Sequence, residues 1–228
     1  MTKKLICCDV FKEEIMSMQL PPDIEPQFIS MGLHLHPVKL HEEIRAAVER
    51  AAGCSLIILG FGLCGGSLKG IEAPGCPMVI PRVHDCIPVL LGSKDKFRAL
   101  QLEDKRTFYF SGGWVEGDRM IIREHERSVN KFGPKRALRI LNILFENYNR
   151  LMYIHTGHPR DLETLDKTRG LADILQFPCL ETRGFHDYLK KLIHGPWDVE
   201  QFLTVPANGS IDEEEFLRDG AELNIQGC

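Results

Sequence analysis

The sequence predicts an α/β protein of the Rossmann-like, doubly wound type, in which helices cover both faces of a mostly parallel sheet. Short apolar runs of strand length alternate along the chain with longer segments of helical periodicity, an order typical of β-α-β units. Of the 228 residues, 43% are hydrophobic and 26% charged, the composition of an ordinary globular protein. The strongly apolar run Ser55–Leu59 leads directly into a glycine-rich turn.

The first half of the chain begins with two predicted strands. The run KLICCD predicts a strand at Lys4–Asp9, and QFISMGL predicts another at Gln27–Leu33. Val38–Ala52 has apolar residues near i, i+3, i+4 and i+7, which predicts an amphipathic helix that Gly53 can end. Ser55–Leu59 then predicts the third strand.

The middle of the chain repeats this alternation. PMVI predicts a strand at Pro77–Ile80, and a helix is expected at Asp85–Leu91, because an extended turn there would leave a long apolar segment unpaired. TFYF predicts a strand at Thr107–Phe110. Helical patterns follow at Gly117–Val129 and Pro134–Tyr148, where the proline suits the first helical position.

The last part predicts a strand, two helices and a late strand. They are expected, in order, at Arg150–Ile154, Arg160–Leu175, Phe185–Ile193 and Gln201–Val205. We expect a single α/β domain over residues 1–228, with an acidic C-terminal tail over 206–228.

Charge and hydropathy exclude several classes of partner. The net charge of −4 predicts no basic face, so nucleic acid is not expected as a partner. No apolar run approaches the roughly 18–20 residues that span a bilayer, so no membrane association is expected. The N-terminal apolar stretch is too short for a signal peptide, and we expect a cytoplasmic protein with reduced thiols.

Soft metal ligands gather at the carboxyl ends of the predicted strands, where ligands bind in open parallel sheets. The residues at these ends are Cys8, Asp9, His34, His36, Cys64, Arg82, His84, Asp85, Cys86, Trp114, His155 and His158. If the strands share one sheet, most of these side chains meet at one edge.

Cys8, Cys64 and Cys86 are the expected metal ligands, because three thiolates from three loops suit zinc or an iron–sulfur cluster. We take His34 as the fourth ligand, with His36 and His84 as alternatives. Cys7 and Cys8 point to opposite faces of a strand, and Cys8 lies nearer its end. No C-x-x-C pair is present, so this site depends on the predicted topology. The remaining cysteines are expected in the core: Cys7, Cys54, Cys76 and Cys179.

His84 and Asp85 are the expected catalytic residues, as general acid or base or as groups that orient a ligand. Arg82 is expected to bind an anionic group of a small-molecule substrate, the alternative being an ion pair with Asp85 or Asp9.

Three further residues are expected at the substrate: Gly65, Gly66 and Trp114. Glycines let backbone N–H groups approach a charged ligand. The turn is neither G-x-G-x-x-G nor a P-loop, so it does not predict nucleotide binding. His155 and His158 could be a metal pair, a substrate contact or polar loop residues.

Several motifs resemble the domain-of-unknown-function 1638 family. They are CDVFKEE at Cys8–Glu14, LHLHP at Leu33–Pro37, GLCG at Gly62–Gly65, the long stretch Ile80–Ser93, and GGW at Gly112–Trp114. They cover roughly the first half of the chain, and the second half offers little to match.

The resemblance implies a genomic context for the protein rather than a particular activity. Genes of this family are described beside corrinoid methyltransferase systems, which implies a role near cobalamin-dependent methyl transfer, with a corrinoid protein or methyltransferase as partner. The site residues that it carries over are Cys8, His34, Cys64, His84 and Cys86. The family commonly has Thr-Pro-Gly-Trp where this chain has SGGW at 111–114, which predicts a more flexible loop here.

The resulting hypothesis is a metal-dependent enzyme of small-molecule metabolism, a transferase or lyase that holds zinc or a 4Fe–4S cluster. The expected reaction is methyl transfer to or from a corrinoid or a thiol. One alternative is a non-enzymatic metal or cofactor carrier for a corrinoid system. Another is a metal-free module that binds an anion at the glycine-rich turn. The apolar helix Pro134–Tyr148 could also pack against a second copy, giving a homo-oligomer.

Overall fold

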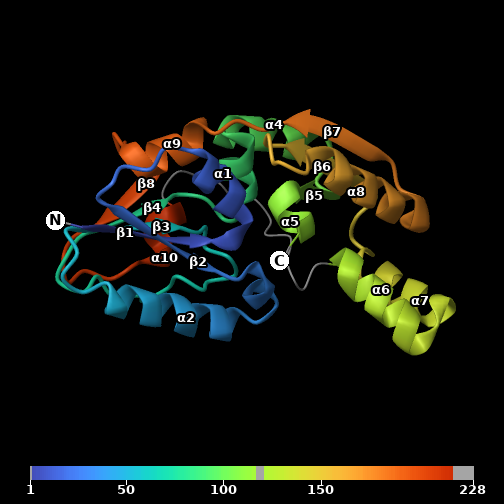
Figure 1. Cartoon of the computed structure of the whole chain (residues 1–228), viewed down its shortest axis with the longest axis horizontal. Coiled ribbons are helices and arrows are strands. Elements are labelled where there is room, and N and C mark those ends of the chain that lie inside the picture. The colour runs from blue at the N-terminus through green and yellow to red at the C-terminus, as the bar shows by residue number, and fades with distance from the viewer. Residues whose placement is uncertain (1, 117–120, 218–228) are drawn as a thin grey trace.

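The computed structural model describes residues 2–116 and 121–217, and its strands form two sheets toward opposite ends of the molecule (Figure 1). The first sheet has the strand order β2-β1-β3-β4-β8, and the second has the order β5-β6-β7. The strands are β1 Lys3–Cys8, β2 Ile24–Ile29, β3 Leu56–Gly60, β4 Met78–Pro81, β5 Thr107–Ser111, β6 Arg150–His155, β7 Cys179–Arg183 and β8 Phe202–Val205. The predicted helix start at 117–120 and the tail over 218–228 lie outside the described residues.

The first sheet is parallel except at one edge. β1 runs parallel to β2 and β3, β3 runs parallel to β4, and β8 pairs with β4 in the antiparallel sense. Every residue of β3 is buried, as expected for a parallel strand covered on both faces. Figure 1 shows α2 (Pro37–Arg50) on one face and α1 (Lys12–Ser17) and α9 (Asp187–His194) on the other. The predicted Rossmann-like α/β class is therefore confirmed.

Apolar spacing explains how these helices attach. In α2 the buried residues are Leu40, Ile44, Ala47 and Val48, which recur at the spacing of one helix face. Full burial of a leucine or isoleucine side chain contributes about 1.5–3 kcal/mol, so this stripe fixes α2 against the sheet.

The second sheet is entirely parallel and has its own helical cover. β5 pairs with β6, and β6 pairs with β7. The interior strand β6 is buried from Leu151 to Ile154, and α8 (Asp161–Leu175) packs against it. The predicted strands thus divide between two sheets rather than sharing one.

Most predicted helices are present, with shifted ends. The other helices are α3 Ile87–Leu91, α4 Lys94–Glu103, α5 Gly112–Glu116, α6 Ile121–Phe132, α7 Pro134–Leu144 and α10 Glu213–Leu217, and two 3-10 turns are η1 Asp9–Phe11 and η2 Met31–Leu35. The second strand begins and ends earlier than predicted, because the chain turns into η2 at Met31. The sequence analysis did not identify α1, α4, α5 and β7.

The carboxyl ends of β1 and β5 approach each other at the centre of the molecule, where α5 meets η1 (Figure 1). A Cβ atom at Gly113 would lie 2.9 Å from the carbonyl carbon of Val10 and closer still to its oxygen. Only glycine permits this approach of two backbones. The SGGW segment therefore forms a strand end and a tightly packed helix, not the flexible loop that was expected.

Candidate functional site

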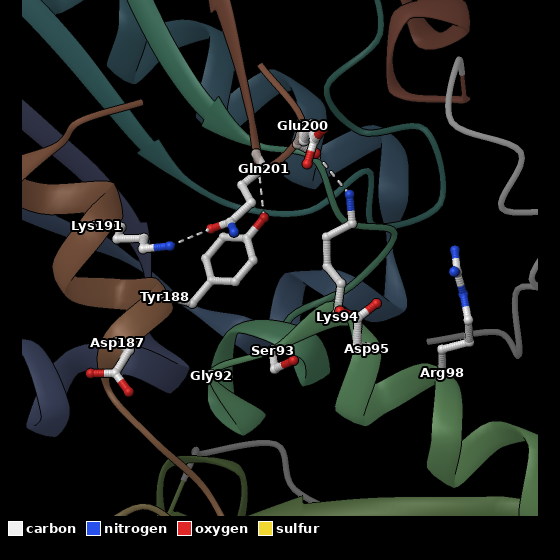
Figure 2. A pocket seen from close by; sticks show the side chains of 10 residues that line it. All are labelled: Gly92, Ser93, Lys94, Asp95, Arg98, Asp187, Tyr188, Lys191, Glu200 and Gln201. Atoms are coloured by element: carbon white, nitrogen blue, oxygen red, sulfur yellow. Dashed lines mark hydrogen bonds between the residues drawn. The ribbon is translucent and has the colours of Figure 1, made fainter. Parts of the chain in front are cut away.

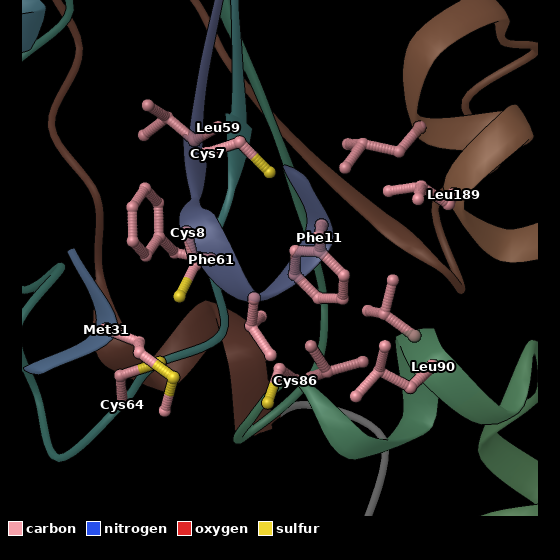
Figure 3. Close-up of a cluster of buried hydrophobic side chains, with 14 of the residues drawn as sticks. Cys7, Cys8, Phe11, Met31, Leu59, Phe61, Cys64, Cys86, Leu90 and Leu189 are labelled. Carbon is pink, nitrogen blue, oxygen red and sulfur yellow. The ribbon is translucent and has the colours of Figure 1, made fainter. Parts of the chain in front are cut away.

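The three predicted thiol ligands lie at the ends of three neighbouring strands of the first sheet. Cys8 ends β1, Cys64 lies in the turn after β3, and Cys86 precedes α3 after β4. Figure 3 shows these cysteines with Met31 around the same end of the sheet. All three are buried, with 3%, 4% and 7% of their surfaces exposed, respectively. We call Cys8, Cys64, Cys86 and His34 the thiol cluster.

His34 is in direct contact with Cys8. Its Nε2 lies 3.5 Å from the Cys8 Sγ, in a buried position. The 3-10 turn η2 points His34 inward, whereas His36 is exposed. Asp9 supports this turn, because its Oδ1 accepts a hydrogen bond from the Met31 N–H at 2.8 Å.

The backbone holds Cys64 in place. The N–H groups of Leu63 and Cys64 donate to the carbonyls of Val83 and His84, so the loops after β3 and β4 lie against each other. Cys64 itself has a φ of 45°, in the left-handed region that L-residues other than Gly, Asn and Asp seldom adopt. Such strain in a non-glycine residue is often found at functional sites.

The glycines around Cys64 have separate roles. A Cβ at Gly62 would lie 2.8 Å from the Asp85 nitrogen, so Gly62 allows the two loops to touch. Gly65 and Gly66 have φ values of 71° and 84° and meet little or nothing nearby. The space beside their Cα atoms is therefore open, but the Gly66 N–H already donates to the Leu63 carbonyl at 2.9 Å, which leaves Gly65 for the predicted anion-binding role.

Cys86 connects the thiol cluster to the second sheet. The Trp114 indole N–H donates to the Cys86 Sγ at 3.3 Å. Trp114 belongs to α5, and its ring packs edge-on against Phe108 of β5 at 6.2 Å between centroids. The structure thus brings Trp114 to the predicted site, although it comes from another sheet.

His84 and Asp85 are half-buried beside the cluster. The Asp85 carboxylate caps α3 by accepting a hydrogen bond from the Ile87 N–H at 2.8 Å. Arg82 makes neither of the ion pairs considered as alternatives. Its guanidinium donates to the backbone carbonyls of Phe202 and Glu215 through Nε and Nη1, which uses two of its five N–H groups and leaves the others for an anion.

Burial shifts the pKa values of several groups at the site toward the uncharged form. It raises the pKa of the Cys8 thiol, and the neighbouring Cys86 raises that pKa further. It also lowers the pKa of His34 to about 4. Asp85 is affected in the same way, because burial raises its pKa against the opposing effects of the Ile87 N–H and His84.

As the side chains stand, the cluster does not enclose a metal ion. Within residues 2–116 and 121–217, no three His, Cys, Asp or Glu side chains converge as ligands of one ion would. The pair Cys8–His34 is in contact, while Cys86 is engaged by Trp114.

Four polar residues that the sequence analysis did not assign to a site lie between the two sheets. They are Glu14, Ser111, Thr156 and His186, and they accompany His158, whose role was left open. Glu14 and Ser111 belong to motifs that the resemblance singled out, CDVFKEE and SGGW, and this was the only signal in the sequence.

An open cavity of about 370 Å³ lies elsewhere, between the start of α4 and α9 (Figure 2). It is lined by Gly92, Ser93, Lys94, Asp95, Arg98, Asp187, Tyr188, Lys191, Glu200 and Gln201. None of the predicted site residues lines it, and its basic and acidic side chains balance in number. This cavity therefore favours neither an anion nor a cation.

The chain belongs to the family described as "Protein of unknown function (DUF1638)", whose model matches residues 28–193. The match extends well into the second half of the chain, beyond the motifs that carried the resemblance. No curated protein and no solved structure matches the chain significantly. None of the helices in the described part of the chain has the length and apolar character needed to cross a bilayer.

Proposed function

We propose that this protein is a metal-dependent enzyme of small-molecule metabolism whose thiol cluster binds zinc or an iron–sulfur cluster. One observation carries the proposal: Cys8 and His34 are in contact at 3.5 Å in a buried position, where the loops that bear Cys64 and Cys86 also meet. Three thiols and one imidazole form a suitable donor set for zinc, and three thiols with an open position suit a cluster.

Metal binding requires local rearrangement. Cys86 would exchange the hydrogen bond from Trp114 for the metal, and the thiol of Cys64 would turn toward Cys8. The backbone already brings the loops that bear Cys64 and Cys86 together, and Cys8 is close enough to Cys86 for the two thiols to interact electrostatically. A bound zinc ion or cluster would supply Lewis-acid chemistry or electron transfer and would hold the thiols in the thiolate form.

The residues around the thiol cluster would then bind the substrate and hold or move a proton. Arg82 binds an anionic group of the substrate through the N–H groups of its guanidinium that its two backbone partners do not use, and the N–H group of Gly65 assists. His84 and Asp85 hold or move a proton beside the substrate. The reaction class, methyl transfer to or from a thiol or a corrinoid on a partner protein, depends on the family setting alone.

The first test is metal analysis of protein purified without oxygen, together with its optical spectrum. About one zinc per chain supports a mononuclear site, and about four irons with sulfide support a cluster. Cys64→Ser should lose the metal, and Cys179→Ser in β7 should retain it. No metal in the wild type would refute the proposal and leave the anion-binding module, which phosphate titration would test. A bound metal without methyl transfer in the presence of a corrinoid protein would favour the carrier role.

A second copy of the chain is the partner that the surface favours. The helical hairpin α6–α7 leaves large apolar side chains exposed, namely Phe132, Leu138, Ile140, Ile143 and Leu144. No described residue of α6 is buried, and in α7 only Ala137 and Leu141 are, so most of the apolar surface of the hairpin has no cover among the described residues. Two such hairpins together would form a four-helix bundle.

The charges of the hairpin favour an antiparallel arrangement of two copies. Basic side chains gather near the turn at Gly133, and acidic ones lie toward the opposite ends. The basic residues are Lys131, Lys135, Arg136 and Arg139, and the acidic ones are Glu124, Glu126 and Glu146, which lie alongside Arg123 and Arg127, the latter paired with Glu124. A two-fold axis across the hairpin would set the basic turn of one copy against the acidic end of the other.

A further inference from the structure

Between the two sheets lies a group of buried polar side chains that the thiol cluster does not use. Glu14 comes from α1, directly after the first strand of the first sheet. Thr156 and His158 follow β6 of the second sheet. Only 3% of Glu14 and 5% of His158 is exposed. A carboxyl group and an imidazole from opposite sheets are thus both removed from water.

In both Glu14 and His158, one polar atom of the side chain forms a hydrogen bond and the other has no partner among the described residues. The Thr156 hydroxyl donates to Glu14 Oε1 at 2.6 Å, and Glu14 Oε2 is buried with no hydrogen-bond partner in residues 2–116 and 121–217. The Arg160 N–H donates to His158 Nδ1 at 3.2 Å. The neutral His158 ring therefore carries its proton on Nε2, and this N–H is also buried without a partner.

Ser111 adds a third unpaired group. Its hydroxyl is fully buried at the end of β5 and has no partner. The next residue, Gly112, lies against the His158 ring, since a Cβ there would be 2.6 Å from Nδ1. The end of β5 and His158 are therefore neighbours.

The carboxyl group of Glu14 and the imidazole of His158 interact electrostatically. Burial raises the pKa of Glu14, while the hydrogen bond from Thr156 and electrostatic interactions with the His158 and His186 rings lower it. His186 also fixes the loop, because its Nε2–H donates to the Thr156 carbonyl at 2.6 Å. The nearby guanidinium of Arg160 is paired with Glu116 and so does not supply a charge for an anion.

Buried polar atoms in native proteins are nearly always hydrogen-bonded, so atoms of Glu14, His158 and Ser111 that have no partner among the described residues, all at this junction of the two sheets, indicate a missing partner. His158 Nε2–H can only donate, Glu14 Oε2 as a carboxylate can only accept, and the Ser111 hydroxyl can do either. A hydroxyl group satisfies all of them, because it accepts from His158 and donates to Glu14.

We propose that Glu14, His158 and Ser111 form a binding site for the hydroxyl group of a small molecule at the junction of the two sheets. The site goes beyond the proposed metal function, because it uses none of the metal ligands. Its occupant shares hydroxyl chemistry with water, and the experiment must separate an alcohol from a water molecule.

The test uses 2-fluoroethanol as the probe and measures the transverse relaxation of its fluorine in the presence of the full-length protein. Wild-type protein should accelerate this relaxation, and both Glu14→Gln and His158→Gln should abolish the effect. Thr168→Val is the control, because the buried Thr168 hydroxyl is already bonded to the Thr164 carbonyl at 2.9 Å. This control should keep the effect.

Thermal unfolding separates a binding site from a structural water site. Ser111→Ala removes an unpaired hydroxyl and should raise the unfolding midpoint by about 2–4 °C, whereas Thr168→Val should lower it. If the wild type leaves the probe unchanged, or if Ser111→Ala lowers the midpoint as the control does, the proposal is wrong and the site holds only water. The metal content of the same samples tests the thiol cluster independently, so the two proposals fail separately.

Discussion

The close approach of α5 and η1 leads to the most specific prediction, for the substitution Gly113→Ala. The new Cβ would lie 2.9 Å from the Val10 carbonyl carbon, 3.2 Å from its Cα and closer still to its oxygen. Non-bonded carbon atoms rest about 3.5–4.0 Å apart, so the two backbones must separate by roughly 1 Å. Backbone cannot yield as a flexible side chain can.

The expected cost is at the upper end for overpacked sites, about 3 kcal/mol. For a chain of this size that loss lowers the unfolding midpoint by about 6–12 °C, measured by circular dichroism. The separation should also expose Cys86, because Trp114, the donor to its Sγ, follows the substituted glycine. Alkylation followed by mass spectrometry should therefore show faster modification of Cys86 in the variant.

A matched glycine in another helix gives the control. Gly170 lies in α8, is exposed, and has nothing within 4 Å of the position that a Cβ would take. Gly170→Ala should raise stability by about 1 kcal/mol through helix propensity alone. If Gly113→Ala has the same small positive effect, the two sheets do not meet through this glycine and the reasoning is wrong.

Three further predictions address other parts of the molecule. Tyr153→Phe removes a buried hydroxyl that donates to Asp161 at 2.9 Å, and should cost about 1–2 kcal/mol in urea unfolding; an unchanged midpoint would contradict this. Because burial raises the pKa of Glu14, its protonated form is favoured in the folded state, and its contribution to stability declines as pH rises from about 4.5 through the raised pKa. Glu14→Gln should remove this decline, and equal slopes of unfolding free energy against pH in both proteins would count against it. Ile143→Glu should convert a dimer to a monomer in light scattering, while Leu102→Glu, at a position that is even more exposed, should not; a monomeric wild type would refute the dimer.

The fold class could be predicted because local patterns and the final structure agree. Ser55–Leu59 is apolar throughout, and β3 is buried throughout. The edge strand β7 was missed, because its sequence CLETR is polar and half-exposed and has no apolar alternation. The helix α4 was missed for a similar reason, since Phe97 is its only buried residue.

Only part of the candidate site could be predicted from the sequence. Cysteines at strand ends pointed to the thiol cluster, and the structure places Cys8 against His34. Glu14 could not be assigned, because its partner Thr156 lies 142 positions away on the second sheet. No local pattern records a contact of that separation.

By itself, the sequence determined the strands, the main helices and the residue types at the strand ends, because strand burial and helix periodicity are local properties of the chain. Only the tertiary structure decided that the strands form two sheets whose carboxyl ends face each other. That arrangement depends on backbone approaches such as Gly113 against Val10, where the absence of a side chain matters. It brings Trp114 to Cys86, and it buries Glu14 Oε2 and His158 Nε2 with no hydrogen-bond partner among the described residues, and from these observations both proposed sites follow.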